Sequence, residues 1–432
     1  MDAGVLHPSR RPYRFAVLLF AAGMIFGSYF AYDSLGAIES LLIDELGIGR
    51  NVVGATYTMY SLAAIPAVLA GGFLVDRLGT RRASLVFSSF IVAGAVLVAL
   101  APNVGTIYAG RLLFGMGSES LIVCQSAILA RWFTGRELAL AFGIALTVSR
   151  LGTLFSFNTE ALVAQRFGIA GALWLAAGLC GLSLLSNLAC NLLDRRARGA
   201  LGLVEGSAGD RIVVADIARF RPSFWYVTFL CLTFYSAIFP FTALSTDFFH
   251  EKWGLPLTAA DEGAGFLAQV LSNYLHLFST AGGTTSIVIL ASMLCAPFAG
   301  RLVDRVGRRA SLMVAGALLL VVAHLALGLT ALPPAAPMVV LGAAFVLVPA
   351  AMWPSVPLLV EKERVGTAFG LMTAIQNVGL MAFPWLNGQL RDLTRGWVAS
   401  QVLFACLGAG GFLCALLLLR ADRRAGGRLE RA

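Results

Sequence analysis

Apolar stretches of about twenty residues recur along the chain, with short polar segments between them. A stretch of that length can span the roughly 30 Å hydrocarbon core of a bilayer. Because backbone polar groups in lipid must be satisfied within the segment, each stretch is expected to be a helix. The pattern therefore predicts an all-α membrane protein. The twelve predicted spans lie approximately at 15–38, 52–75, 83–101, 104–130, 138–162, 169–193, 223–248, 282–303, 310–331, 338–360, 366–390 and 397–419.

Charge is scarce and unevenly placed. The 432 residues are 58% hydrophobic and 13% charged, whereas soluble domains average about 25% charged residues. Of the 32 Lys and Arg residues, 25 fall in the tails and alternate loops, and five fall in loops of the opposite face. This asymmetry follows the positive-inside rule and puts both termini in the cytoplasm. The net charge of +9 therefore reflects topology, and we expect the lipid bilayer and no nucleic acid as a partner.

Residues that could carry enzymatic chemistry are sparse. All seven cysteines fall in predicted spans without a C-x-x-C pair, and the four histidines are scattered. Neither a disulfide framework nor a metal site is indicated. No predicted span carries a nucleophile with a base or a set of metal ligands. We expect no metal, no cofactor and no enzymatic activity.

One loop sequence occurs twice, once in each half of the chain. GFLVDRLGTRR (72–82) and GRLVDRVGRRA (300–310) match at seven of eleven positions, each after the second helix of a six-helix group. Two parallel six-helix halves are the architecture of the major facilitator superfamily, and the loop resembles the signature loop of that superfamily. The predicted parts are the N-terminal half 1–193, a cytoplasmic linker 194–222, the C-terminal half 223–420 and a cytoplasmic tail 421–432.

The repeated loop is a candidate gating element. Its glycines could let neighbouring helices approach closely. Its aspartates, Asp76 and Asp304, could accept hydrogen bonds from helix N-termini or pair with Arg81 and Arg309. Contacts made in only one conformation decide which side opens. The alternative is a topology signal with a turn glycine. The candidate gating residues are Gly72, Asp76, Arg77, Arg81, Gly300, Asp304, Arg305 and Arg309.

Two charged residues stand near the middle of apolar spans. Glu119 lies in GRLLFGMGSESLIVCQSAI, and Arg150 lies in ALTVSRLGTLF on the next span. A lone Arg at the bilayer centre costs at least ~2.5–3.5 kcal/mol, so both side chains are expected to face the bundle interior at similar depth. A buried ion pair that fixes helix packing is one interpretation. The other is a substrate site for a zwitterion, with its ammonium on Glu119 and its carboxylate on Arg150.

The stretch from GRLLFGMGSES to ALTVSRLG resembles the fourth and fifth helices of a lysosomal dipeptide transporter family, major facilitator superfamily domain-containing protein one. The similarity continues in GSYFAYDSLGA, FYSAIFPF and AMWPSVPLLVEKERVGTAFGLMTAIQNVGL. This resemblance implies dipeptide transport by facilitated diffusion, as a uniporter, through a central cavity. The acid–arginine pair of the family falls on Glu119 and Arg150.

The chain departs from that family at three places. Its outer loop 249–281 is long, and position 246 is Thr where the family has a lysine after the FPF element. The N-terminal MDAGVLHPSRRPYR shows no acidic dileucine sorting signal. We therefore expect the plasma membrane, or the inner membrane of a bacterium, rather than a lysosome.

Other polar and aromatic residues inside the spans are weaker candidates for the site. Gln376 and Asn377 could hydrogen-bond a peptide amide or serve inter-helix packing. Asp33 could line an outer vestibule, take a proton or snorkel to water, and Arg111 could line the vestibule or cap a nearby loop. The aromatic residues could be cavity walls or core. These aromatic candidates are Tyr57, Tyr60, Tyr235, Phe241 and Trp353.

Within the long outer loop, apolar residues recur at helical spacing from Phe266 to Phe278. This indicates an amphipathic helix that lies either on the membrane interface or on the protein.

These features favour a carrier of zwitterionic solutes, most of all dipeptides, that works by alternating access. One alternative is a proton-coupled carrier of organic anions such as monocarboxylates, in which Arg150 binds the carboxylate and Glu119 or Asp33 titrates. Another is a receptor with this fold that binds its ligand without transport. By analogy with the fold, we expect a monomer.

Overall fold

The computed structural model describes residues 11–100, 103–133, 137–201, 217, 219–259, 263–361 and 364–431; within these ranges the side chains of residues 72, 76, 139, 198–201 and 304 are not described. The described chain is built from helices. They are α1 (Arg11–Ala37), α2 (Glu39–Leu46), α3 (Arg50–Leu100), α4 (Val104–Phe133), α5 (Leu138–Leu201), α7 (Pro222–Thr242), α8 (Ser245–Trp253), α9 (Phe266–Leu275), η1 (Leu277–Ser279), α10 (Ala281–Val306), α11 (Arg309–Leu329), α12 (Ala335–Met352), η2 (Trp353–Ser355), α13 (Val356–Leu359), α14 (Val365–Thr394), α15 (Val398–Arg424) and α16 (Arg428–Arg431).

Within these ranges, eleven helices are long and apolar enough to cross a membrane. One of them runs for 58 residues from Leu140 to Ala197, far more than the ~20 that a bilayer core needs. It bends at Gly168, whose positive φ of 75° breaks the helical path and is readily adopted only by glycine. Gly79 breaks α3 in the same way. Counted on both sides of Gly168, the helices agree with the twelve predicted spans.

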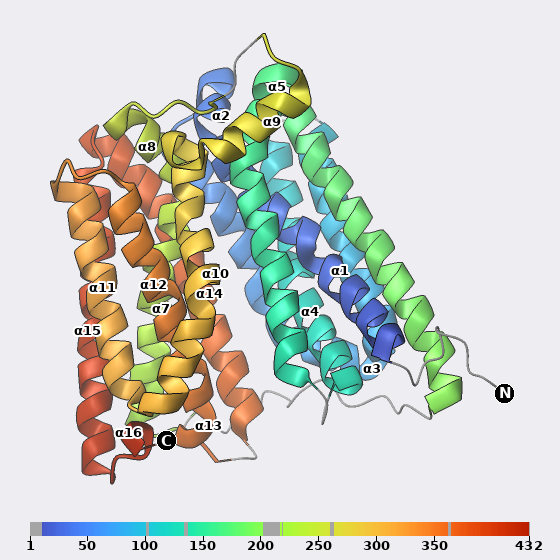
Figure 1. The fold of residues 1–432 in the computed structure, drawn as a ribbon, viewed down its shortest axis with the longest axis vertical. Helices are drawn as coiled ribbons and strands as arrows, with labels where there is room; N and C mark the ends of the chain where they lie inside the picture. Colours follow the sequence, from blue (N-terminus) through green and yellow to red (C-terminus); the bar gives the residue numbers. More distant parts are fainter. Residues whose placement is uncertain are drawn as a thin grey trace.

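The helices form two groups, each around its own apolar core. One core is built from side chains between Tyr13 and Ala197, and the other mostly from side chains between Phe220 and Leu429. Figure 1 shows α1–α5 gathered on one side and α7, α8 and α10–α16 on the other, whereas α9 lies against α5. The first residues of α1 lie at the same end of the bundle as the last of α15. We call this end the inner side and the opposite end the outer side.

Two predicted spans end earlier than expected. The seventh, predicted to reach residue 248, ends at Thr242, and the chain starts a new helix, α8, at Ser245. The break follows Pro240, which lacks a backbone N–H. The tenth, predicted to reach 360, ends as an α-helix at Met352 and continues as η2 and α13, again beside a proline, Pro354.

The predicted outer-loop helix is present as α9, and it packs on the protein with its polar side. Gln269 accepts a hydrogen bond from Arg166 (2.9 Å), and Asn273 donates to the carbonyl of Asn158 (3.2 Å), both on α5. The apolar residues Leu267 and Leu271 face outward and are exposed. Of the two arrangements expected for this helix, packing on the protein is therefore observed.

Candidate substrate cavity

A cavity of about 860 Å³ lies between the two groups of helices. Its wall is formed by α1, α3, α4 and α5 on one side and by α7, α10, α12 and α14 on the other. The lining continues to Phe73 and Gly366, which belong to the inner part of the bundle. The cavity therefore faces the inner side.

The outer end is closed by hydrogen bonds between the two groups. Arg50 of α3 bonds to Asp247 of α8 (2.5 Å) and to Glu251 (2.7 Å). Asn51 donates its backbone N–H to Asp392 of α14 (3.0 Å). Apart from this cluster, Asn158 of α5 donates a hydrogen bond to Ser286 of α10 (3.0 Å). The conformation is therefore closed on the outer side. We call the cluster of Arg50, Asp247, Glu251, Arg391 and Asp392 the outer gate.

Glu119 reaches the cavity from α4. Gly115 and Gly117 let α4 pack tightly against α3, because a Cβ on either glycine would lie 2.2 Å from a backbone carbonyl oxygen of α3. This contact brings Glu119 beside Tyr60, whose hydroxyl donates to its Oε1 at 2.9 Å. Among the described residues, Glu119 makes no ion pair within 4.0 Å. Its carboxylate is thus held by a neutral donor and can accept a cation.

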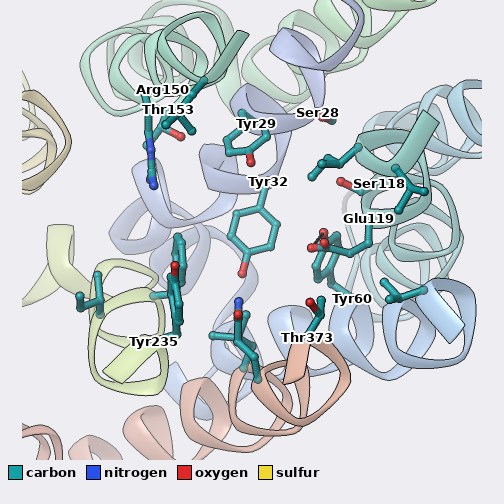
Figure 2. A pocket seen from close by; sticks show the side chains of 18 of the residues that line it. Ser28, Tyr29, Tyr32, Tyr60, Ser118, Glu119, Arg150, Thr153, Tyr235 and Thr373 are labelled. Carbon is teal, nitrogen blue, oxygen red and sulfur yellow. Dashed lines mark hydrogen bonds between the residues drawn. The ribbon is translucent and has the colours of Figure 1, made fainter. Parts of the chain in front are cut away.

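Arg150 reaches the same cavity from α5. Its guanidinium lies 4.3 Å from the centre of the Phe345 ring on α12, close enough for a cation–π interaction. It makes no ion pair with any described carboxylate within 4.0 Å. Both charged residues predicted to face the interior do so. Figure 2 shows that they stand on opposite sides of the cavity rather than in contact.

Helix α1 is the reason for their separation. It packs closely on both segments of α5: a Cβ on Gly152 would lie 2.6 Å from the carbonyl oxygen of Phe26, and one on Gly27 would lie 2.3 Å from that of Leu179. Tyr29 and Tyr32 of α1 consequently project between Glu119 and Arg150 (Figure 2). Glu119 and Arg150 thus face one cavity from consecutive spans, but the side chains of α1 separate them.

The second acid of the cavity is Asp33, one turn beyond Tyr29 on α1. It lines the cavity rather than an outer vestibule, and no described cation lies within 4.0 Å of it. Arg111, in contrast, is buried against α1, where it donates to the carbonyl oxygens of Tyr32 (2.7 Å) and Ala31 (3.3 Å). Its position fits the structural capping role that was one of its two predicted roles.

The C-terminal group contributes uncharged polar groups. Trp353 donates its indole N–H to the hydroxyl of Tyr235 (3.1 Å), and Gln376 accepts from the thiol of Cys231 (3.4 Å). Tyr235, Trp353 and Gln376 all line the cavity, as does Tyr60. The charged residues of the lining thus all come from the N-terminal half, whereas both halves contribute neutral hydrogen-bonding groups.

Three predicted binding residues do not line the cavity. Tyr57 is 1% exposed and packs against Tyr32, behind the wall. Phe241 is buried among Phe248, His324 and other aromatic rings because the chain breaks just after it. The side chain of Asn377 turns back to the carbonyl oxygen of Thr373 (3.1 Å). Aromatic and amide residues within a span are equally suited to core positions. Residue type alone therefore does not distinguish a residue of the cavity wall from one of the core.

Several lining residues escaped the sequence-based prediction. They include Ser28, Tyr29, Tyr32, Ser118, Thr153, Thr373 and Phe345. Thr153 is three residues beyond Arg150, so helical spacing around that charge could have indicated it. The sequence does not indicate the outer gate either, because charged residues near the ends of spans are explained by topology alone.

The repeated loop is only partly described. The side chains of Asp76 and Asp304 lie outside the described residues, as does any contact of Gly72. Arg77 and Arg305 are exposed, and Arg309 donates to the carbonyl oxygen of Pro354 (3.2 Å). Gly300 has open space at its Cβ position, so the expected close helix approach there is wrong for this conformation. The gating role of the loop, including that of Arg81, stays a prediction.

A family model described as Major Facilitator Superfamily matches residues 18–270 and 257–432, which together cover nearly the whole chain. The chain belongs to the major facilitator superfamily. Solved structures of this fold agree with it. A mutant of the nucleoside transporter NupG has a TM-score of 0.68 at 14% identity over 94% of this chain and 99% of that one. The peptide transporter POT with sulfate has a TM-score of 0.70 at 15% identity over 96% of each chain.

Curated relatives are similar along almost the full length of this superfamily member. The lysosomal dipeptide transporter MFSD1 of Danio rerio is 32% identical over 93% of this chain and 86% of the relative. The protein of that name from Homo sapiens is 31% identical over 98% of this chain and 89% of its own length. With such relatives and this fold, the chain is a membrane transporter and not an enzyme.

The expected location is wrong. The relatives carry the word lysosomal in their names, which contradicts a plasma or bacterial inner membrane. A missing sorting motif in a short N-terminal stretch was weak support for that expectation. Embedding in a membrane is supported by the spans and the family.

Proposed function

We propose that this transporter carries dipeptides across a lysosomal membrane by alternating access, with the cavity between its halves as the substrate site. The observation that carries the proposal is the pair Glu119 and Arg150. Each charge faces the cavity, and neither is neutralised by a described residue within 4.0 Å. Buried charges are costly unless paired, so such a site favours a ligand that supplies both missing partners. A peptide with a free ammonium and a free carboxylate does so.

The size of the cavity is in keeping with a dipeptide. Ligand pockets commonly enclose about 300–1,000 Å³, and the cavity holds about 860 Å³. The terminal charges of an extended dipeptide lie ~7 Å apart at the usual rise per residue. Because Tyr29 and Tyr32 keep Glu119 and Arg150 apart, the two charges can bind the two ends of one peptide rather than each other. The tyrosine hydroxyls and the amide of Gln376 are suitable partners for its N–H and C=O groups.

Transport of a neutral dipeptide should be measured in lysosomes that carry the tagged protein and in proteoliposomes made from purified protein. We expect saturable uptake that unlabelled dipeptides compete for and that a peptide blocked at both ends does not. Free amino acids and monocarboxylates serve as the comparison set. Thermal stabilisation by dipeptides without any flux would contradict transport and favour a receptor. Uptake of monocarboxylates but not of dipeptides would contradict the substrate assignment.

Asp33 is the observation that favours the second candidate, a proton-coupled carrier. It is an acid in the cavity without a described ion-pair partner within 4.0 Å, and it could carry a proton with an anionic substrate. The two candidates differ in their response to a pH gradient. Dipeptide uniport should continue without a gradient, whereas coupled transport of an anion should be driven by one.

A Tyr60→Phe variant should be less stable than the native protein in the absence of substrate. The Tyr60 hydroxyl is the described donor to Glu119, and a buried polar group that loses its partner costs about 1–3 kcal/mol. The melting temperature of the ligand-free protein measures this loss. Tyr57→Phe is the matched control, since the Tyr57 hydroxyl is buried without a hydrogen bond of good geometry. Equal melting temperatures for both variants would show that the contact with Glu119 contributes nothing.

A further inference from the structure

The outer gate encloses an acid that forms no ion pair with any residue that the structure describes. Glu39 begins α2, and it is fully buried. Neither of its carboxylate oxygens has a hydrogen bond of good geometry to a described residue. Its neighbour Asp247 takes the available cation, because Arg50 lies 2.5 Å from Asp247 and 2.7 Å from Glu251. Glu39 plays no part in the substrate cavity, whose wall it does not join.

The charged form of Glu39 is disfavoured at this place. Burial raises the pKa of the Glu39 carboxyl well above its ordinary range, and the negative charge of Asp247 adds to the rise. Arg50 and the backbone of Asp247 oppose it, and Glu251 adds a smaller increase. Glu251 itself behaves in the opposite way. Although its partial burial raises its pKa, the hydrogen bonds from Arg391 and Trp397 together with the charge of Arg50 outweigh this, and the pKa of Glu251 is lowered.

The titratable groups around Glu39 come from each packed element. On α8 they are Asp247 and Glu251, on α3 they are Arg50 and Tyr57, and on α14 the gate adds Arg391 and Asp392. On α1 the nearest acid along the chain is Asp33, which faces the cavity. The α5 residues toward this end are Glu160, which is buried without a hydrogen bond, and Arg166, which bonds to Gln269. No cation among them forms an ion pair with Glu39 within 4.0 Å.

The burial of Glu39 depends on closure of the gate. Its neighbour Ser40 donates to Asp247 (3.1 Å), and Thr246 donates to the carbonyl oxygen of Gly36 (2.5 Å). Both contacts join the N-terminal half to the C-terminal half directly beside Glu39. When the halves separate on the outer side, these contacts must break and water must reach the carboxylate.

We propose that Glu39 is a proton-binding site of the outer gate, which takes a proton from the outer compartment as the gate closes. The proton returns to the same compartment when the gate opens, because Glu39 is sealed from the inner cavity. The site thus senses outer pH and does not carry protons with substrate. It does not depend on which solute is transported.

The direction of the pH effect follows from the two states. Glu39 has a raised pKa in the closed gate and its ordinary pKa in the hydrated open gate, so the closed gate binds more protons between those values. Acidification through that window therefore favours closure, by up to tenfold in the closed-to-open ratio per pH unit for a single proton. Glu251, whose pKa is lowered in the closed gate, would favour opening only at a pH below its ordinary pKa. There, protonation breaks its ion pairs. An acidic outer compartment should thus hold the carrier in the form that faces the inner side.

Distances between spin labels on the two halves can test this with the full-length protein in lipid nanodiscs. Labels at Glu45→Cys and Leu393→Cys, both exposed positions on the outer side, report closure, with the exposed Cys406 replaced by Ser. We expect the closed fraction to rise as pH falls from about 7.5 to 5.5 with a slope of up to tenfold per unit. Glu39→Gln should remain closed throughout. Asp44→Asn, an exposed acid on the same helix, should keep the native response.

A native pH response in Glu39→Gln, or none in the unsubstituted protein, would overturn the proposal. If Glu39→Gln does not fold, Glu39→Met tests the same proposal with a neutral side chain of similar length. Dipeptide uptake with inner and outer pH equal distinguishes failure here from failure of the proposed transport. If dipeptide uptake persists but the closed fraction does not change with pH, only the proton site is rejected. Absent uptake with a pH-sensitive gate rejects only the substrate assignment.

Discussion

Replacing Gly388 with Val should trap the transporter open on its outer side and abolish most of its transport. A Cβ at Gly388 of α14 would lie 2.3 Å from the carbonyl oxygen of Arg50 and 2.5 Å from the backbone nitrogen of Asn51 on α3. Gly54 of α3 meets α14 in the same way, 2.2 Å from the carbonyl oxygen of Pro384. These are backbone atoms of the other half, and they can make room only if the halves part.

Overpacking against backbone costs typically 1–3 kcal/mol or more, so the closed form should lose roughly ten- to a hundredfold in population. The spin-label distances on the outer side should lengthen, and dipeptide uptake should fall in proportion. Gly178→Val is the control, because nothing lies within 4 Å of a Cβ at that position of α5. Native uptake by Gly388→Val, with outer distances unchanged, would show that this contact is not needed for closure.

The spans could be predicted because they rest on a local physical requirement. A bilayer demands a long apolar run, and this requirement holds whatever the helix packs against. The cost of burying charge likewise selected Glu119 and Arg150 as interior residues. The helix ends were less predictable, since the seventh span, expected to reach residue 248, ends at Thr242, two residues after Pro240.

Which helix stands between two charges cannot be read from the spans themselves. The glycines at 27 and 152 let α1 pack in contact with α5, and the tyrosines of α1 separate Glu119 from Arg150, which the order of the spans along the chain does not indicate. The outer gate was hidden for a related reason. Arg50, Asp247 and Asp392 lie near the ends of spans, where charges usually meet water, and their partners are about 200 and 340 residues away in the sequence.

The most specific test of the substrate site separates the two ends of a peptide. Glu119→Gln should weaken the binding of peptides with a free ammonium and leave an N-acetylated analogue almost unaffected. Arg150→Lys keeps the charge but loses the bidentate fork, so it should weaken the binding of a free carboxylate, while an amidated peptide should be largely indifferent. Each lost charged hydrogen bond should cost ~1.5–3 kcal/mol, roughly ten- to a hundredfold in affinity.

Affinity should be measured by thermal shift or calorimetry on purified variants whose folding has been verified. The two substitutions act as each other's control, since each should spare the peptide that the other penalises. The described contacts sharpen the expectation: Glu119 and Arg150 are not in contact with each other, so neither substitution leaves the other as a buried charge newly deprived of its partner. If blocked and free peptides lost affinity equally in both variants, the two residues would act on the shape of the cavity, and the zwitterion site would have to be abandoned.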